Sequence, residues 1–272
     1  MNSDRRRREL ADFLQSRRKR LSPQELGLQA GASRRRTPGL RREEVASLSG
    51  ISIPWYTALE QGRDIQVSEQ VLESLVRTLK LSPDERNYLF ILANPSLMTK
   101  AAEESTPPAL QAILDRMGTY PAYVIDKRWN ISAWNQMTST LCGELNGSAE
   151  IERNILWRVF VMERNKASIV NWEHVSSRLL AHFRNRYAWH LNDPWYQELI
   201  SKLHDQSEEF RAGWERHEVA GNSEGDQVIQ HPEAGRLAFR YHTFAVSENS
   251  DFFMRVYTPL ENNGSLDRLV NL

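Results

Sequence analysis

The residues best suited to metal chemistry in this 272-residue chain lie in its last third: His217, His231 and His242, with Glu215 and Glu218. Their spacing is not that of a metal site, because no Cys or His pair stands at a compact ligand distance and no helical Glu-x-x-His motif is present. His217 is better explained by hydrogen bonding within its domain, and His231 by its place at a strand end. The sequence therefore predicts no metal site and no required cofactor.

Cys142 is the only cysteine, so it cannot form a disulfide within the chain. As a nucleophile it would need a neighbouring base and a third group that orients the base, and the local sequence offers neither. No Gly-rich phosphate loop or Gly-x-Ser-x-Gly turn occurs. We predict that the protein is not an enzyme and that Cys142 is a buried residue at a helix end.

The basic N-terminal segment lacks the apolar core of a secretory signal. No apolar run reaches the ~18 residues that a bilayer-spanning helix needs. Together with the cysteine count, these features predict a cytoplasmic protein with no membrane partner.

Positive charge is concentrated at the start of the chain, although the whole chain is neutral. Lys and Arg outnumber Asp and Glu by 17 to 12 up to Asn94, whereas the acids lead by 23 to 18 beyond it. Residues 1–42 alone hold 13 basic and 4 acidic residues, in the blocks RRRR (5–8), RRKR (17–20), RRR (34–36) and RR (41–42). Such a stretch is typical of a surface that binds a polyanion; the alternatives are a solvated surface or a disordered basic arm.

The first 94 residues are predicted to form about five helices. Apolar residues recur at helical spacing, and Ser82 with Glu85 three residues on forms a capping box before the last helix. The predicted elements are a helix over 9–20, a helical turn over 24–28, a helix starting near Thr37-Pro38, a second helix after Gly50, and helices over 67–81 and 82–93.

Gly50 marks a sharp turn between two short helices. It permits a left-handed backbone, and Ala46 four residues earlier keeps the crossing point thin. Ser52 is expected to cap the second helix, with Pro54 tolerated in its first turn. The inward residues are predicted to be Val45, Ala46, Ile51, Tyr56 and Leu59. This arrangement is a helix-turn-helix.

The stretch "REEVASLSGIS", followed by "IPWYTALEQGR", resembles the lambda-repressor/Cro-like (XRE) family of DNA-binding domains, and the resemblance covers about residues 5–93. It implies that the second helix reads the major groove of double-stranded DNA. With Tyr56 and Leu59 buried, the opposite face is apolar and is expected to read thymine methyls and local shape. That face comprises Ser52, Ile53, Pro54, Trp55, Thr57, Ala58 and Gln61. Trp55 alternatively packs on a neighbouring helix.

Affinity is then expected to come from arginines that contact phosphates. The predicted contacts are Arg34, Arg35, Arg36, Arg41, Arg42 and Arg63. An ion pair between Arg41 and Glu60 within the domain is the alternative for Arg41.

The polar, proline-containing segment 95–108 is predicted to be a linker between a DNA-binding domain over 1–94 and a second domain over 109–272. Beyond it, short alternating runs predict strands at "AYVID", at "WNISAW" and in three places within 229–260. Helices are expected near 135–142, 150–165, 168–187 and 193–213. The fold class is therefore an all-α domain followed by an α+β domain with a mostly antiparallel sheet.

The stretch "YVIDKRWNISAWNQMTSTLCG" has the layout of a PAS-like domain. With "EEFRAGWERHEV", "HPEAGRLAFRYHTF" and "RVYTPL", it resembles the ligand-binding domain that follows a Cro-like helix-turn-helix in MmyB-like bacterial transcription regulators. The resemblance implies a cytoplasmic regulator whose second domain encloses a small apolar, fatty-acid-like ligand and pairs subunits into a homodimer.

The aromatic residues of the second domain are compatible with such a ligand, because large flat side chains suit an apolar cavity. Leu237, Phe239 and Tyr241 alternate onto one strand face, which is expected to be the inner one. A buried carboxylate would need a cation or donors, and the candidates in order are Arg184, Tyr187, Arg240 and His217. The predicted ligand set is Trp134, Trp157, Phe160, Phe183, Arg184, Tyr187, Trp214, His217, Leu237, Phe239 and Tyr241. For each aromatic residue, simple core filling is the alternative.

The function predicted from these features is a ligand-responsive, DNA-binding transcription regulator. A protein-interaction adaptor and an enzyme, each with a helix-turn-helix that no longer binds DNA, remain the alternatives. The arginine blocks argue against the adaptor, since a domain that does not bind DNA has no reason to concentrate basic residues.

Overall fold

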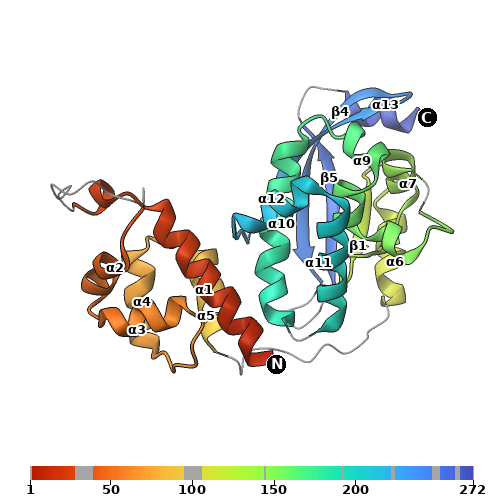
Figure 1. The fold of residues 1–272 in the computed structure, drawn as a ribbon. Coiled ribbons are helices and arrows are strands. Elements are labelled where there is room, and N and C mark those ends of the chain that lie inside the picture. Colours follow the sequence, from red (N-terminus) through yellow and green to blue (C-terminus); the bar gives the residue numbers. More distant parts are fainter. Residues whose placement is uncertain are drawn as a thin grey trace. The chain divides into compact units, whose positions relative to one another are not determined.

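A computed structural model describes most of the chain, and its contacts divide it into two compact units (Figure 1). Unit 1 comprises Met1–Ala101, Ala181–Pro194 and Trp214–Gly221; unit 2 comprises Ala102–Leu180, Trp195–Gly213 and Asn222–Leu272. The sequence-based domains place 181–194 and 214–221 in the second domain, whereas the contacts group both segments with the N-terminal helices. The described residues are 2–27, 39–94, 106–143, 145–191, 193–221, 224–246, 252–260 and 264–271.

The N-terminal part of unit 1 is helical, as predicted. Its elements are α1 (Asn2–Arg20), the 3-10 turn η1 (Pro23–Leu26), α2 (Arg42–Ser49), α3 (Ile53–Glu60), α4 (Glu69–Thr78) and α5 (Pro83–Ala93). Helix α1 contacts α3 and α5, and α2 contacts α3 and α4; Figure 1 shows α2, α3 and α4 gathered at one side of α1. Phe13 and Leu14 of α1 are fully buried in the resulting core.

The first helix is longer than the sequence indicated, because it begins at Asn2 rather than at residue 9. Asp4 lies in its first turn, where a negative charge favours the positive end of the helix dipole. The Asp4 carboxylate also pairs with Arg7 three residues later. The arginine-rich start is therefore part of the helix in the structure.

The turn between α2 and α3 has the predicted geometry. Gly50 adopts a left-handed backbone with φ 68° and ψ 29°. The Ser52 hydroxyl accepts a hydrogen bond from the Trp55 amide at 3.3 Å and so caps α3. Ser82 caps α5 in the same way, with Glu85 completing the capping box.

Unit 2 is built on a five-stranded sheet in the order β2-β1-β5-β4-β3, and every neighbouring pair is antiparallel. The strands are β1 (Ala122–Ile125), β2 (Ile131–Trp134), β3 (Glu224–His231), β4 (Gly235–Ala245) and β5 (Phe253–Pro259). The α+β prediction is thereby confirmed. Strand β3 begins at Glu224, earlier than predicted. Residues 224–227 pair with β4, but they lack the apolar alternation from which a strand is recognised in a sequence.

The helices of the second half are more numerous than the sequence indicated. The described elements are α6 (Pro108–Arg116), α7 (Gln136–Cys142), η3 (Glu150–Arg153), α8 (Ile155–Phe160), α9 (Glu163–Ser168), α10 (Trp172–Tyr187), η4 (Ala188–His190), α11 (Pro194–Gln206), α12 (Glu208–Glu215) and α13 (Ser265–Val270).

Two predicted helices are interrupted by side chains that start a new helix. Within 150–165, the Asn154 side chain accepts bonds from the amides of Leu156 and Trp157, at 3.1 and 3.3 Å, and begins α8. Within 193–213, the Ser207 hydroxyl accepts the Phe210 amide at 3.1 Å and begins α12. Periodicity alone does not register such caps, since the apolar spacing continues across them.

The two faces of the sheet bury different kinds of residue. On one face, Ala122, Val124 and Met254 join Leu110 and Leu114 of α6 in an apolar cluster. The opposite face carries Leu237, Phe239 and Tyr241, which are all buried as predicted. We call this second face the inner face.

Strand β3 stands at the edge of the sheet, and the segment before α10 covers part of it. The Val170 amide donates to the Val228 carbonyl at 2.8 Å. The Asn171 side chain donates to the Asp226 carbonyl and accepts from the Val228 amide, each at 2.9 Å. These bonds satisfy backbone groups that an open edge would leave unpaired.

Candidate DNA-binding and ligand-binding sites

Helix α3 presents one face to the core and the other to solvent. Tyr56 and Leu59 are buried, as the sequence predicted, whereas the Ile53 side chain is 50% exposed. The remaining residues of the predicted groove-reading face are exposed or partly buried, namely Ser52, Pro54, Trp55, Thr57, Ala58 and Gln61. The structure therefore brings the predicted face together on one side of one short helix.

A buried carboxylate fixes α3 against its neighbours. Glu60, the last residue of α3, is 1% exposed. Its two oxygens accept bonds from Arg18 Nε at 2.5 Å and Arg18 Nη2 at 3.0 Å, and from Arg42 Nε at 2.7 Å. Burial alone would raise the pKa of Glu60, but the bonds from Arg18 and Arg42 outweigh it and lower that pKa. Glu60 thus joins α1, α2 and α3 as a carboxylate.

Several arginines of the predicted polyanion surface are instead internal ion-pair partners. Arg17 and Arg18 are 3% and 8% exposed, and Arg17 pairs with Glu85 of α5 at 3.0 Å. Arg17 and Arg18 of the RRKR block are therefore not open to a polyanion, whereas Lys19 and Arg20 remain exposed. Sequence alone could not separate these arginines from solvated ones.

The predicted phosphate contacts have different surroundings. Arg63 is exposed beyond the end of α3. Arg41 pairs with Glu43 at 3.2 Å, so the alternative pairing with Glu60 is wrong; Arg42 occupies that place. Both side chains remain about two-fifths exposed, at 42% and 41%. Arg34, Arg35 and Arg36 lie outside the described residues.

Five members of the predicted ligand set belong to unit 1, and two of them, Arg184 and His217, are basic. Arg184 is 1% exposed, and its Nη1 donates to Glu9 Oε1 at 2.5 Å and lies 2.8 Å from His217 Nδ1. The Tyr88 hydroxyl donates to the same Glu9 oxygen at 2.6 Å. Burial alone would raise the pKa of Glu9, but Arg184, His217 and Tyr88 outweigh it and lower that pKa to about 2.

The Arg184 guanidinium, which was the first candidate for a ligand carboxylate, is therefore paired with a protein carboxylate. It also donates to the Trp214 carbonyl and lies over the Trp214 ring, 3.8 Å from the centroid. Phe183 and Tyr187 pack against the same indole at centroid distances of 5.8 and 5.7 Å. In the structure, these predicted ligand residues form a packed aromatic and ionic cluster within unit 1.

The other predicted ligand residues belong to unit 2. Phe160 is 4% exposed and packs edge-on against Trp172 and Phe210, so it fills the core. Trp134 and Trp157 are partly buried. Arg240, another carboxylate candidate, is exposed on the face opposite the inner one and pairs with Asp226 at 2.7 Å.

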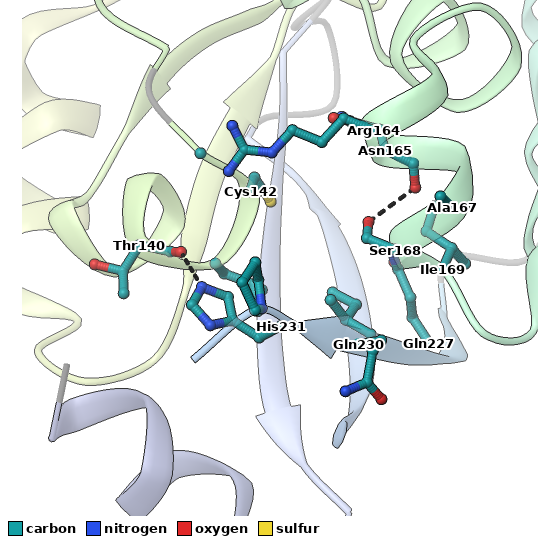
Figure 2. A pocket seen from close by; sticks show the side chains of 14 residues that line it. Thr140, Cys142, Arg164, Asn165, Ala167, Ser168, Ile169, Gln227, Gln230 and His231 are labelled. Atoms are coloured by element: carbon teal, nitrogen blue, oxygen red, sulfur yellow. Dashed lines mark hydrogen bonds between the residues drawn. The ribbon is translucent and has the colours of Figure 1, made fainter. Parts of the chain in front are cut away.

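A pocket of about 320 Å³ opens elsewhere in unit 2, where α7, α9 and β3 meet. Figure 2 shows side chains from these elements around it, with the Arg164 guanidinium beside Cys142 and Gln227 on the strand. A volume of this size suits a small molecule. None of the predicted ligand residues lines it; the lining is Thr140, Leu141, Cys142, Gly143, Arg164, Asn165, Ala167, Ser168, Ile169, Gln227, Ile229, Gln230, His231 and Pro232.

Two residues of the pocket bear on the question of catalysis. His231 Nε2 lies 3.0 Å from the Thr140 carbonyl, and Nδ1 accepts the Ala234 amide at 3.1 Å, as Figure 2 shows in part. Because Nδ1 accepts, the ring is held as the Nε2-protonated tautomer at the β3–β4 turn, with both nitrogens bonded to backbone groups. Burial raises the pKa of the Cys142 thiol, which keeps it protonated and weakens it as a nucleophile.

The described residues also contain no group of three or more His, Cys, Asp or Glu side chains placed to hold a metal ion. Within the same residues, every helix is too short or too polar to cross a membrane.

The comparisons with known proteins agree with this arrangement. A helix-turn-helix domain model matches residues 9–89, and these include α2, α3 and their turn. A model described as the MmyB-like transcription regulator ligand binding domain matches residues 106–272. No curated protein matches the chain significantly.

A helix-turn-helix followed by such a domain defines a DNA-binding transcription regulator that responds to a ligand, and these families point to a role other than catalysis. The model of the MmyB-like ligand-binding domain matches more than half of the chain, so the chain belongs to the MmyB-like transcription regulators.

Sequence reasoning missed the pocket because most of its lining residues are small, aliphatic or amide side chains that carry no local signature. Thr140, Gln227 and Ile229 are unremarkable in the sequence, and they meet only because β3 returns to the end of α7. The predicted helix end at Cys142 and the strand end at His231 were the nearest signals, since both turned out to border the pocket.

Proposed function

We propose that the protein is a homodimeric, Cro-like (XRE) regulator of the cytoplasm that reads double-stranded DNA with α3 and takes a small, mostly apolar ligand in a PAS-like second domain. The proposed DNA binding is supported by the outer face of α3. There Ile53 and Pro54 are exposed, and buried Glu60 fixes the helix against its neighbours. A rigid helix with one exposed face suits insertion in the major groove.

The face of α3 also indicates how sequence is read. It presents Thr57, Ala58 and Ile53 and carries no Arg or Asn on its exposed side, so exposed Gln61 at its C-cap is the residue of this face that could form bidentate bonds with a base. Such a surface favours contacts with thymine methyl groups and recognition of local shape. Arg63 and the exposed parts of Arg41 and Arg42 are proposed to contact phosphates.

The proposed ligand binding is supported by the pocket between α7, α9 and β3. Leu141, Ile169 and Ile229 supply apolar walls, and Arg164 and Gln227 supply a few polar groups. A largely apolar pocket with few polar groups is the usual form of a small-molecule site. The strand order, with the first and last strands adjacent at the centre, supports the PAS-like assignment.

The test combines binding of DNA with identification of the ligand. The full chain is used to select sequences from a random duplex library, and fluorescence anisotropy of the selected duplex is measured over a salt series. We expect tight, salt-dependent binding to an enriched, roughly palindromic sequence. No enrichment, or binding that does not respond to salt, would favour a protein-interaction adaptor. Mass spectrometry of molecules that co-purify with the chain identifies the ligand class.

A further inference from the structure

The Glu9 carboxylate of α1 is held by groups from three other parts of unit 1. Arg184 lies near the end of α10, Tyr88 belongs to α5, and His217 follows the end of α12. The Glu9 side chain is 12% exposed and the Arg184 side chain 1%. His217 Nδ1 lies 3.6 Å from Glu9 Oε1. We call these four residues the Glu9 cluster.

Helices α10 and α12 each have residues in both units. Residues 172–180 of α10 are grouped with unit 2 and residues 181–187 with unit 1. In α12, residues 208–213 belong to unit 2, whereas Trp214 and Glu215 belong to unit 1. The part of the chain that matches the ligand-binding domain therefore includes two helices whose last residues belong to the same compact unit as the helix-turn-helix.

The start of α10 is attached to the wall of the pocket. Ile169, just before α10, lines the pocket and forms a bridge with Ile229 of β3, which lines it too. The next two residues, Val170 and Asn171, hold β3 through hydrogen bonds to its backbone. A molecule that displaces this part of the wall therefore displaces the start of α10.

Helix α1 connects the Glu9 cluster with α3. Later in the same helix, Arg18 bonds to Glu60, the last residue of α3. At about 1.5 Å per residue, Glu9 and Arg18 stand roughly 13 Å apart along one continuous helix. A rigid helix of this length carries a displacement from one contact to the other.

His217 has a backbone conformation that residues other than glycine rarely adopt. Its φ is 51°, in the left-handed region, and such a residue persists where its surroundings stabilise it. Arg17 of α1 donates to the His217 carbonyl oxygen. The His217 ring lies 2.8 Å from Arg184 Nη1. Contacts from α1 and α10 thus stabilise a strained turn, and movement of α1 allows that turn to relax.

The pair of Glu9 and Arg184 favours two discrete arrangements over a gradual change. Both side chains are buried, and each charge is costly to bury without the other. The pair is stable when it is closed, or when it is open with both charges in water, whereas a partly opened pair leaves buried charge uncompensated. Coupling between distant sites requires an element of this kind.

We propose that the Glu9 cluster is the contact through which α10 regulates α3: when it is formed, α1 is fixed to the ends of α10 and α12, and α1 passes that constraint to α3 through Arg18 and Glu60. The path runs from Ile169 in the pocket wall along α10 to Arg184, and from Glu9 along α1. The inference rests on the proposed function, in which α3 reads DNA and the second domain takes a ligand, and it adds how the two activities are coupled.

A cluster that only stabilises the fold is the alternative, and thermodynamic linkage separates the two. If α10 changes the affinity of α3 for DNA, DNA must change the equilibrium of α10 by the same factor. A cluster that only stabilises the fold does not respond to DNA.

The experiment measures hydrogen exchange of the full-length protein by mass spectrometry, with and without a saturating amount of the duplex selected from the random library. In the wild-type protein, DNA should change the exchange rates of amides in 181–187 and 214–221 by about fivefold or more. The double variant Glu9→Gln/Arg184→Met removes both charges and leaves neither unpaired, so it should bind DNA without that response. Glu73→Gln, which removes a partly exposed ion pair with Arg86, is the control and should keep the response.

Two results would overturn the inference and leave the proposed DNA binding standing. The first is a duplex that binds the wild-type protein without changing exchange in these two segments. The second is a response that survives in the double variant. If fluorescence anisotropy detects no binding of any selected duplex to the wild-type protein, the proposed function fails, and the inference fails with it.

Folding of the variants is checked by circular dichroism. If the double variant does not fold, Tyr88→Phe tests the same cluster, because it removes one hydrogen bond to Glu9 and keeps the aromatic ring that packs on Phe13. The response of this variant to DNA should be smaller than that of the wild-type protein. An unchanged response overturns the proposal.

Discussion

Replacing Glu60 with Gln tests the ion pairs with Arg18 and Arg42 that hold α3 against α1 and α2. The substitution keeps the shape of the side chain and removes its charge, so Arg18, which is 8% exposed, loses its carboxylate partner. Breaking a buried ion pair by neutralising one partner costs about 3–5 kcal/mol. Arg42 contributes a smaller share, because its side chain is 41% exposed and water compensates the loss.

That cost is a large fraction of the ~5–15 kcal/mol by which folded proteins are stable. Hydrogen exchange of the full-length protein, measured by mass spectrometry at pH 7, should therefore show faster exchange of the α1, α2 and α3 amides in Glu60→Gln. The variant Glu60→Gln/Arg18→Met should recover part of the lost stability, because it leaves no unpaired charge at Arg18. Glu43→Gln, which changes an exposed carboxylate on α2, is the matched control and should leave exchange unchanged.

The effect of Glu60→Gln should also depend on pH. The folded-state pKa of Glu60 lies below its ordinary value of 4.5, so the charge stabilises the fold above that value and ceases to do so as pH falls through the lowered pKa. The difference between wild type and variant should therefore be full at pH 7 and shrink below about pH 4.5. A difference under about 1 kcal/mol at pH 7, or one that is the same at pH 3, would refute the assignment of Glu60 as a buried, paired carboxylate.

Three further predictions concern the DNA and the pocket. Arg63→Ala should weaken binding to all DNA sequences alike and reduce by ~0.9 the slope of the logarithm of the binding constant against the logarithm of salt concentration. Ile53→Asn should instead change which sequences are enriched in a selection. The same sequence profile from both variants would mean that the reading face is misassigned. Footprinting should show two half-sites separated by about one helical turn, ~34–36 Å, or a multiple of it, and a single asymmetric half-site per complex would exclude the two-fold dimer. Ile229→Trp should fill the pocket and reduce the amount of ligand that co-purifies with the chain, measured by mass spectrometry. Phe160→Trp, which changes a core residue outside the pocket lining, should lower stability and leave the binding site intact, and the reverse pattern would place the ligand against Phe160.

The helix-turn-helix could be predicted in detail because its determinants are local. A left-handed backbone at Gly50, a cap at Ser52 and burial of Tyr56 and Leu59 depend on residues within one or two turns of helix. The strand alternation of Leu237, Phe239 and Tyr241 is local in the same sense, and their burial on one face is confirmed.

Partners of the charged residues could not be predicted, because sequence distance does not limit ion pairs. Arg18 pairs with Glu60 across 42 positions, and Arg184 pairs with Glu9 across 175. The sequence placed the first arginine on a polyanion-binding surface and the second beside a ligand, since an unpaired charge and a paired one look the same in a linear chain. Only the folded structure separates them.

The sequence by itself determined the order of the two domains, the helix-turn-helix and the antiparallel α+β character of the second half. The tertiary structure decided which surfaces are available for binding. The pocket exists because β3 pairs with β4 and returns to α7 and α9, and Arg255 is buried because β1 and β4 set Tyr123 and Thr243 beside it. Local preference specifies a helix or a strand, but the environment of a side chain is set by residues that long-range pairing brings beside it.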